Sequence, residues 1–305
     1  MTISVAGAPV SFGVFEMTPE GAETVAPDDM LSILSDIGYE GVDLGPVGYF
    51  GEGAQLRERL QRHGLELAGG WVQLPMTDDD AFKAALPELH RALTVFRDAT
   101  TSAPHRMPLP TLADSGSSAR SAAPGRGQHV DPLTEAAFER LVANASRAAD
   151  IVRDSGFEPT FHHHAGTYVE SPEEIDRFLS ATDIGLTLDV GHLAIAGGDP
   201  LALVQRWGTR INHLHLKDVA TATLQRTIDA GGGMPEVWSS GAFTALGQGD
   251  LDLAPVLDAV IHNGFNGWIV VEQDVLNGPD ISIDTFQSER AADQRANREL
   301  LRAWI

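Results

Sequence analysis

HLHLKD, from His213 to Asp218, is a short β-rich run that ends in imidazole, ammonium and carboxylate groups. Three other runs end in the same kind of residue: TFHHHAG from Thr160, LTLDVGH from Leu186 and WIVVEQD from Trp268. Short runs rich in β-branched and aromatic residues are typical of strands. Because parallel barrel strands bring their carboxyl ends to one face, these polar groups are expected to meet there. The four runs therefore predict a site for one divalent metal ion.

Strand-like runs alternate with helix-like segments along the whole chain, and this alternation predicts a parallel sheet with crossover helices. The predicted strands are Ile3–Ala8, Gly41–Leu44, Glu66–Val72, Met107–Ala113, Thr160–His164, Gly185–Asp189, Ile211–Leu216 and Gly267–Glu272. The predicted helices are Pro27–Ile37, Ala54–His63, Asp78–Ala99, Pro132–Ser155, Pro172–Ser180, Pro200–Trp207, Leu253–Asn263 and Asp284–Ile305. Several helices begin at a cap signal, such as Ser171-Pro172 and Asp199-Pro200. The pattern predicts a (β/α)8 TIM barrel, and 305 residues suit a single barrel domain over residues 1–305.

A doubly wound open sheet is the rival fold, but no Gly-rich phosphate loop follows the first strand. Two stretches interrupt the alternation: residues 115–130, which are small, polar and rich in Pro and Gly, and residues 218–250, which contain a Gly run at 231–233. Both are predicted to be long loops, after strands four and seven, on the catalytic face. A long loop in a compact domain is usually functional or disordered. Residues 115–130 are therefore either an active-site lid or a mobile loop without a role.

Composition excludes several classes of protein. There is no cysteine, so disulfides, thiolate zinc sites and a cysteine nucleophile are excluded. A formal net charge of −22 argues against nucleic acid as a partner, and an apolar share of 43% is enough for a large core. The start MTISVAGAPVSFG has no basic segment of a signal peptide, and no window approaches a membrane span of about 20 apolar residues. These features predict a cytoplasmic protein without a membrane partner.

Alternation along a strand predicts which histidines share a face. His162 and His164 are expected to point toward the barrel axis, and His163 away from it. In HLHLKD, His213 and His215 likewise share one face. One histidine of each pair can then bind the ion while the other contacts the substrate.

Two carboxylates end strands beside these histidines. Asp189 offers a hard oxygen ligand, with Gly191 to let the backbone turn and His192 on the following loop. Glu272 follows an apolar run, where a carboxylate needs a cation or strong hydrogen bonds. Nitrogen and oxygen donors without sulfur suit Mn²⁺, Co²⁺, Fe²⁺, Mg²⁺ or Zn²⁺, and the two carboxylates favour a hard ion, Mn²⁺ first. Such an ion stabilises an enediolate, and a nearby His or Glu serves as the general base.

The segments FHHHAGTYVESPEEIDRFL, LTLDVGHLAIAGGDPLALV, INHLHLKDV and GWIVVEQD resemble the inosose dehydratase branch of the xylose-isomerase-like superfamily of sugar isomerases and epimerases. The resemblance runs from about Thr160 to the end of the chain. It is looser through GYEGVDLG at residues 38–45 and weak over residues 98–130. It implies a TIM barrel, one divalent metal ion and a sugar or polyol ketone as substrate.

On the matching positions, the resemblance places metal ligands at Asp189, His215 and Glu272. The fourth ligand falls at the end of strand five, where many relatives carry Glu and this chain has His162. Epimerases of this kind use a metal-bound carboxylate on each face of the substrate. Elimination of water needs one base and one acid, so this departure favours a lyase.

The resemblance also implies which groups transfer protons. His164 or Glu272 is expected to remove the proton beside the ketone, and His192 or Lys217 to protonate the departing hydroxyl. Lys217 can instead pair with Asp218 or Glu272. The expected substrate-binding residues are His192, His213, Trp71 and Lys217, with Glu16 and Phe15 as weaker candidates for the pocket wall.

The leading hypothesis is a metal-dependent lyase that removes water from a keto-inositol or related sugar ketone in polyol catabolism. The first alternative is a sugar or keto-inositol isomerase or epimerase that uses the same enediolate. Cleavage of phosphodiesters at abasic DNA is disfavoured by the acidic charge. A non-catalytic metal- and sugar-binding subunit is disfavoured by His164, His192 and Lys217 around the ligands. The expected partners are the small polyol or sugar ketone and, compatible with the superfamily, a second copy of the chain.

Overall fold

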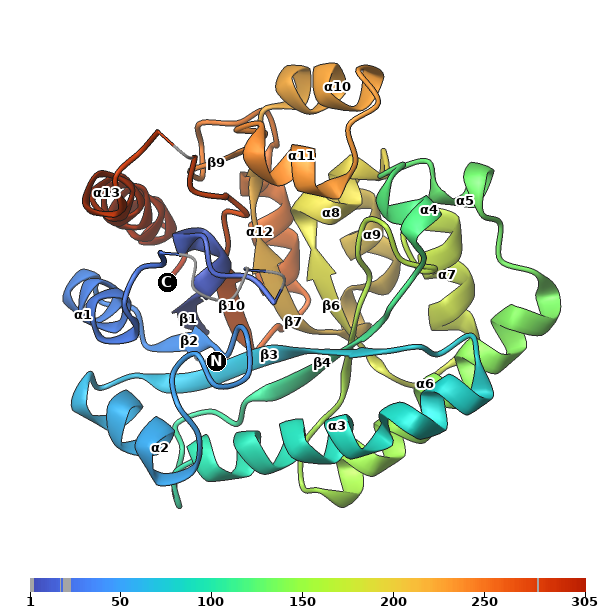
Figure 1. Cartoon of the computed structure of the whole chain (residues 1–305), viewed down its shortest axis with the longest axis horizontal. Helices are drawn as coiled ribbons and strands as arrows, with labels where there is room; N and C mark the ends of the chain where they lie inside the picture. Colours follow the sequence, from blue (N-terminus) through green and yellow to red (C-terminus); the bar gives the residue numbers. More distant parts are fainter. Residues whose placement is uncertain (1–2, 17, 19–22, 279) are drawn as a thin grey trace.

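The computed structural model describes residues 3–16, 18, 23–278 and 280–305. Its centre is a closed barrel of parallel strands in the order β1-β10-β7-β6-β5-β4-β3-β2 (Figure 1). The barrel strands are β1 (Ser4–Gly7), β2 (Gly41–Asp43), β3 (Glu66–Leu74), β4 (Leu109–Asp114), β5 (Thr160–His162), β6 (Gly185–Asp189), β7 (Ile211–Leu216) and β10 (Trp268–Val271). The prediction of a (β/α)8 barrel is confirmed.

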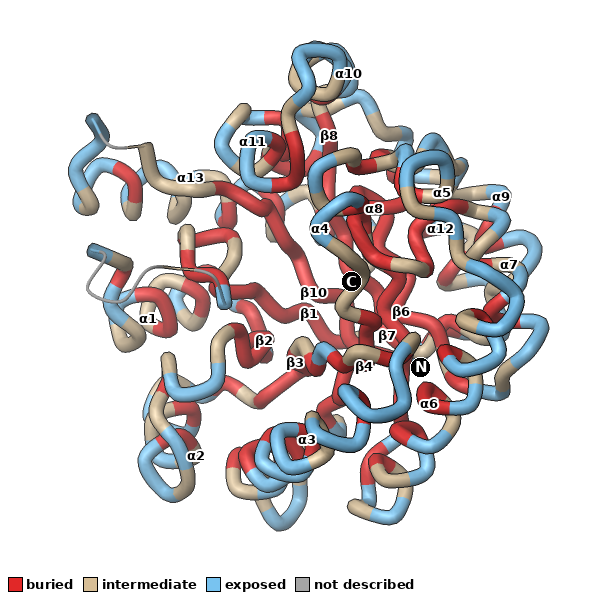
Figure 2. The backbone as a smooth tube through the Cα atoms, turned by 45° about the vertical axis from the view of Figure 1, so that its right-hand side comes forward, coloured by how far each residue is buried: buried red, intermediate tan, exposed pale blue. Residues whose placement is uncertain are grey.

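Helices surround this barrel. The outer helices are α1 (Pro27–Ile37), α2 (Gly53–Arg62), α3 (Asp79–Ala99), α6 (Glu135–Asp154), α7 (Pro172–Ala181), α9 (Pro200–Trp207), α12 (Leu253–His262) and α13 (Ile283–Leu301). Figure 2 shows the strands buried, while the helices alternate between buried and exposed residues, as amphipathic helices on a core do. All the predicted helices are confirmed, with small shifts at their ends.

Local capping chemistry sets where helices begin. The Ser171 hydroxyl accepts from the Glu174 backbone N–H and the Glu174 carboxylate accepts from the Ser171 backbone N–H, which forms a capping box at α7. The Asp199 carboxylate accepts from two backbone N–H groups at the start of α9. Both predicted cap signals are therefore confirmed. The helix predicted from Pro132 begins later, because Thr134 is the residue that caps α6.

The strand carrying the three histidines is shorter than predicted. β5 ends at His162, and the His164 backbone N–H donates to the Val169 carbonyl at 3.2 Å, so the chain has already turned. β10 ends at Val271, yet the Glu272 N–H still donates to the Leu216 carbonyl at 3.0 Å. His164 and Glu272 thus stand just beyond their strands, at the mouth of the barrel.

The two predicted long loops are folded segments, which corrects the sequence prediction. Residues 115–130 contain α4 (Ser118–Ser121) and α5 (Gly127–Val130). Residues 218–250 contain β8 (Asp218–Val219), α10 (Thr221–Asp229), α11 (Met234–Ser239) and β9 (Phe243–Thr244). The remaining short elements are η1 (Pro9–Phe12), α8 (Val190–Ile195) and η2 (Gly208–Arg210). In Figure 1 both inserted segments lie on the same side of the barrel.

Buried polar side chains hold the segment 115–130 in place. Arg120 in α4 is fully buried and donates to the Glu174 carboxylate and the Thr167 carbonyl, both at 2.8 Å. Glu170 accepts from the backbone N–H groups of Gly125, Gly127 and Gly166. The small, polar composition that predicted a loop is therefore outweighed by tertiary ion pairs and hydrogen bonds.

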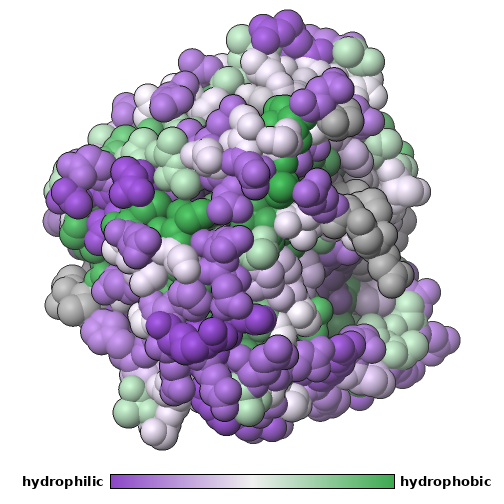
Figure 3. Space-filling model, turned by 60° about the vertical axis from the view of Figure 1, so that its left-hand side comes forward, coloured by the Kyte–Doolittle hydropathy of each residue, from purple (hydrophilic) through white to green (hydrophobic). Residues whose placement is uncertain are grey.

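The face of the molecule that carries α1 and α13 is mostly hydrophilic. Figure 3 shows the face carrying α1 and α13, where hydrophilic residues dominate and hydrophobic residues appear in recesses between them. Among the described residues, no helix is long and apolar enough to cross a membrane.

Candidate active site

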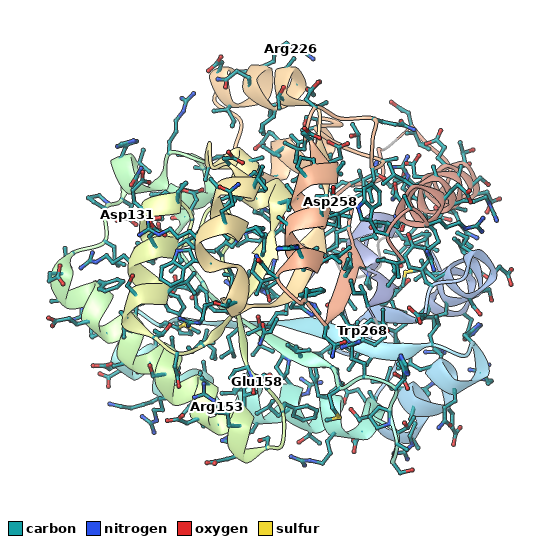
Figure 4. The ribbon with its side chains drawn as sticks, turned by 180° about the vertical axis from the view of Figure 1, so that it is seen from behind. Asp131, Arg153, Glu158, Arg226, Asp258 and Trp268 are labelled. Atoms are coloured by element: carbon teal, nitrogen blue, oxygen red, sulfur yellow. The ribbon has the colours of Figure 1, made fainter. Side chains whose placement is uncertain are left out.

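A cavity of about 240 Å³ opens at the carboxyl ends of the strands. This volume corresponds to roughly eight water molecules, which is the scale of a small organic ligand. Figure 4 shows Arg226, on α10, at the top edge of the molecule, and Trp268, at the start of β10, lower down in its interior. The cavity lies at the Arg226 end, between the strand ends and the inserted segments, and Ser121 and Met234 from those segments line it. The segment 115–130 therefore forms part of the cavity wall, and its role as a lid stays a prediction.

Three predicted ligands meet at this mouth. His162 Nε2 lies 3.1 Å from His215 Nδ1 and 3.5 Å from Asp189 Oδ2, and the last two atoms are 3.6 Å apart. The strand register produces this convergence, because Asp189 is paired with His215 across β6 and β7. An ion bound at about 2.1 Å by tetrahedral donors places them roughly 3.4 Å apart. The three side chains therefore fit a metal ion, and each is buried.

Glu272 joins this group from the other side. Its Oε2 lies 2.9 Å from His215 Nδ1. Lys217 Nζ lies 2.9 Å from the same Glu272 oxygen, 3.0 Å from Asp189 Oδ2 and 2.9 Å from Asp274 Oδ1. The predicted pairing of Lys217 with Glu272 is present. The pairing with Asp218 is absent, because the Asp218 carboxylate accepts from backbone N–H groups of residues 247, 249 and 251.

Negative charge dominates the group. Burial lowers the pKa of His215, but the neighbouring carboxylates of Glu272 and Asp189 more than offset this and raise that pKa to about 10. Burial also disfavours the charged form of Lys217, yet the three carboxylates around it hold its pKa well above the ordinary value. The carboxylates that raise these two pKa values stabilise positive charge at this place, and the same negative charge would stabilise a bound cation.

Asp274 is a member of the site that the sequence reasoning missed. It contacts both Lys217 and His192, with Oδ2 3.4 Å from His192 Nε2. Asp274 closes the run WIVVEQD, two residues after Glu272. Its two-residue spacing from Glu272 was the available signal, since residues at i and i+2 share a face in extended chain.

His164 is oriented as a proton acceptor. Its Nδ1 lies 2.7 Å from the Ala165 carbonyl oxygen. A carbonyl only accepts, so Nδ1 carries the proton and Nε2 keeps a free lone pair. Burial, together with the proximity of His192 and His162, holds the pKa of His164 well below its usual value, which keeps the ring neutral.

The neighbouring rings fix the position of His164. The His192 ring centroid lies 3.6 Å away, and Trp71 makes edge contacts with His162 at 5.1 Å and His164 at 5.0 Å. All four side chains line the cavity. His163 points away and accepts a hydrogen bond from the Asp189 backbone N–H. The predicted alternation of the histidines is therefore confirmed.

His192 lies in a helix, not on a loop as predicted. α8 begins directly after Asp189, whose carboxylate accepts from the His192 backbone N–H at 2.8 Å. Gly191 is needed for space and not for a turn. A Cβ there would lie 2.8 Å from Lys217 Cβ and 3.0 Å from Phe243. The absence of a side chain at Gly191 lets α8 pack against Lys217.

Of the three remaining predicted pocket residues, two line the cavity and one does not. Phe15 and Glu16 line the cavity, as expected of pocket-wall residues. Glu16 is exposed at the mouth, yet the desolvating protein around it and the nearby carboxylates raise its pKa to about 7. His213 is fully buried and does not belong to the described residues that line the cavity. Its predicted contact with substrate is therefore not supported by its position.

The fold and this site define a barrel whose mouth carries buried side chains that could hold a metal ion, and comparison with known proteins identifies its family. Residues 31–304 match the family model described as Xylose isomerase-like TIM barrel, and the chain belongs to that family. The rhizopine catabolism protein MocC of Rhizobium meliloti is 35% identical over 277 residues, covering 89% of this chain and 82% of the relative. The inosose dehydratase of Geobacillus kaustophilus is 31% identical over 280 residues, covering 87% of this chain and 85% of the relative.

Solved structures share the same fold at lower identity. An L-ribulose 3-epimerase superposes with a TM-score of 0.68 at 14% identity, covering 99% of this chain and 94% of that one. A D-allulose 3-epimerase from Methylomonas sp. gives a TM-score of 0.67 at 16% identity, covering 99% and 98%. These similarities establish a shared fold.

Proposed function

We propose that this protein is a metal-dependent lyase that removes water from a keto-inositol or related sugar ketone. The observation that carries the proposal is the pair formed by His162, which ends β5, and His164 just beyond it. His162 stands in the ion-binding group, and His164 presents a free Nε2 beside it. One imidazole base beside the ion suits elimination, whereas the two-base epimerases of the superfamily use a carboxylate at the first of these positions.

The relatives support the same reaction class. A protein named inosose dehydratase aligns over 87% of this chain. On that basis we propose a cyclic polyol ketone as the substrate and inositol catabolism as the metabolic setting. We place the protein in the cytoplasm, since such substrates are metabolised there.

The ion is proposed to be held by His162, Asp189, His215 and Glu272, with Mn²⁺ as the first candidate among divalent metals. Two carboxylates and two imidazoles form a donor set that Mn²⁺ accepts, and Co²⁺, Fe²⁺, Mg²⁺ and Zn²⁺ remain to be compared. When bound, the ion supplies electrostatic stabilisation for the negative charge that develops on the ketone oxygen.

Proton abstraction is assigned to His164 Nε2. Its hydrogen bond to the Ala165 carbonyl fixes the tautomer, and its neutral state at ordinary pH leaves the lone pair available. Glu272 was the alternative base, but Lys217 and His215 hold its carboxylate in ion pairs and keep its pKa low against the opposing effect of burial. His164 is therefore the better base.

The departing hydroxyl needs a proton. Lys217 is a poor donor, because three carboxylates hold its ammonium proton. His192 is also a poor donor, because burial and the charge of Lys217 lower its pKa and leave it neutral. The imidazolium formed at His164 can return its proton to the departing hydroxyl, so one residue serves both steps. Lys217 then acts as a fixed positive charge, and His192 packs against the base.

An isomerase or epimerase is the second candidate function. The structural neighbours named L-ribulose 3-epimerase and D-allulose 3-epimerase favour it. Both reactions begin with the same proton transfer, and they differ in whether a β-hydroxyl departs or the carbon is reprotonated.

One experiment separates the candidates. The Mn²⁺-loaded protein is incubated with a panel of inososes and ketoses in D₂O, and the products are weighed by mass spectrometry. Loss of water from one substrate supports the lyase. Deuterium incorporation without loss of water supports the isomerase or epimerase. Chelator-treated protein and His164→Gln serve as controls, and both are expected to convert the substrates far more slowly.

A further inference from the structure

A second group of buried polar side chains lies directly against the ion-binding group. Asp43 from β2 and His213 from β7 offer ligand atoms that lie, with one of His215, within 4.8 Å of one another. Asp43, His213 and His215 are 6%, 0% and 5% exposed. His215 belongs to both groups. The orientation of its ring toward the ion-binding group therefore depends on its neighbours in the second group.

The polar atoms of this second group have no hydrogen-bond partner. Asp43 Oδ2, both ring nitrogens of His213 and His215 Nε2 are all buried and unsatisfied. The other Asp43 oxygen accepts from the Gly45 backbone N–H at 3.1 Å, which fixes the carboxylate. Unpaired groups at this depth are costly, and their convergence indicates a function.

The backbone is shaped to bring Asp43 inward. The pairing of β2 with β3 shifts register between Val42 and Asp43, and such irregularities re-aim a side chain. Opposite Asp43, Gly69 leaves the required space, because a Cβ there would lie 3.0 Å from His213 Nε2 and 3.2 Å from Asp43 Oδ2. The register shift and the glycine together let the Asp43 carboxylate come within 4.8 Å of ligand atoms of His213 and His215.

We propose that Asp43 is a positioning residue, whose Oδ2 accepts the Nε2–H of His215, directly or through one water, and so directs His215 Nδ1 at the bound ion. His215 Nδ1 already faces Glu272, His162 and Asp189. A histidine that binds through Nδ1 must carry its proton on Nε2, and metal-bound histidines usually donate that proton to a carboxylate or carbonyl. This inference rests on the ion site of the proposed function.

The test compares Asp43→Asn with Asp114→Asn by titration of chelator-treated protein with Co²⁺. Asp114 is a matched control, since it also ends a barrel strand, is 1% exposed and has carboxylate oxygens bonded to backbone N–H groups. Circular dichroism establishes that each variant is folded. Loss of a carboxylate behind a metal-bound histidine typically weakens metal binding by about 10- to 100-fold.

The expected result is one Co²⁺ per chain in the wild type, binding weakened by about 10- to 100-fold in Asp43→Asn with a changed visible Co²⁺ spectrum, and neither effect in Asp114→Asn. Unchanged affinity and spectrum in Asp43→Asn would overturn the inference and leave the proposed function standing. Two Co²⁺ per chain, reduced to one in Asp43→Asn, would also overturn it, because Asp43 would then be a ligand of a second ion. A wild type that binds no Co²⁺, Mn²⁺ or Zn²⁺ would refute the ion site itself.

Discussion

Replacing Lys217 with Met tests whether one buried ammonium holds the carboxylates of the site together. Lys217 is 2% exposed, and its Nζ lies 2.9–3.0 Å from oxygens of Asp189, Glu272 and Asp274. Methionine has a similar length and no charge. The substitution therefore leaves three buried carboxylates without their fixed counter-charge, while most of the apolar packing of the side chain is kept.

The size of the effect follows from the geometry. At 3 Å and an effective dielectric constant of about 20, each ion pair is worth roughly 5 kcal/mol before desolvation is considered. Desolvation of the ammonium offsets much of that sum. Removal of one partner from a buried ion pair typically costs about 3–5 kcal/mol, and we expect a loss of that size in the free energy of unfolding of the ion-free protein.

The loss should depend on pH. In the wild type, burial raises the pKa values of Asp189 and Glu272, but positive neighbours including Lys217 reverse this and hold both below their ordinary values. This stabilisation is present above the pKa values of the unfolded chain, about 4, and is lost as the pH falls. In Lys217→Met, less positive charge opposes the effect of burial, so the pKa values of Asp189 and Glu272 in the folded protein rise. The free energy of unfolding then falls as the pH rises through these raised pKa values. The variant should therefore differ most from the wild type near pH 8 and least near pH 5.

Urea unfolding of chelator-treated protein measures the difference, and Mn²⁺ should stabilise the variant more than the wild type because the ion supplies positive charge. The chain offers one other lysine as a control. Lys83 pairs with Asp80 at 3.4 Å, with side chains 58% and 97% exposed, so Lys83→Met should change stability by only about 0.3 kcal/mol. Equal unfolding midpoints for the two variants would refute the reasoning.

Three further predictions concern the same pocket. His164→Gln should lower kcat by about 10²- to 10⁴-fold, because the general base is lost, and should leave Mn²⁺ affinity unchanged, because His164 lies outside the ion-binding group. Steady-state kinetics and Mn²⁺ titration check the two effects, and full activity would exclude His164 as the base. Gly191→Ala should cost about 1–3 kcal/mol in urea unfolding, because its Cβ would lie 2.8 Å from Lys217 Cβ, and a neutral result would mean that α8 shifts freely. Sugar phosphates should inhibit at least tenfold more weakly than neutral sugars, which corresponds to a binding free energy weaker by about 1.4 kcal/mol. The reason is charge: among the described residues that line the cavity, Lys217 is the sole Lys or Arg, and three carboxylates already surround it. Tight phosphate inhibition would contradict that charge argument.

Much of the site could be predicted because it follows from strand order and alternation. Asp189 and His215 end neighbouring parallel strands, so their meeting follows once the barrel is recognised. His162 and His164 share a face for the same reason, and His163 points away. The presence of Asp274 in the site was harder to predict, because it lies beyond β10 in a segment without a repeating pattern.

Other features depend on contacts between distant residues. The small polar sequence of residues 115–130 has no strong local preference, and α4 is held by the ion pair of Arg120 with Glu174 across the fold. Asp43 reaches the site through a register shift between β2 and β3, which hydrophobic patterning does not encode.

The sequence by itself determined the barrel and most of the strand-end side chains at its mouth, because alternating strands and helices with polar strand ends leave few other arrangements. Tertiary structure decided the state of those side chains. Lys217 is a buried counter-ion because three carboxylates converge on it, and His164 presents Nε2 because its Nδ1 faces the Ala165 carbonyl. Charge state and tautomer depend on distances of a few ångströms between groups far apart in the chain, and only the folded molecule sets those distances.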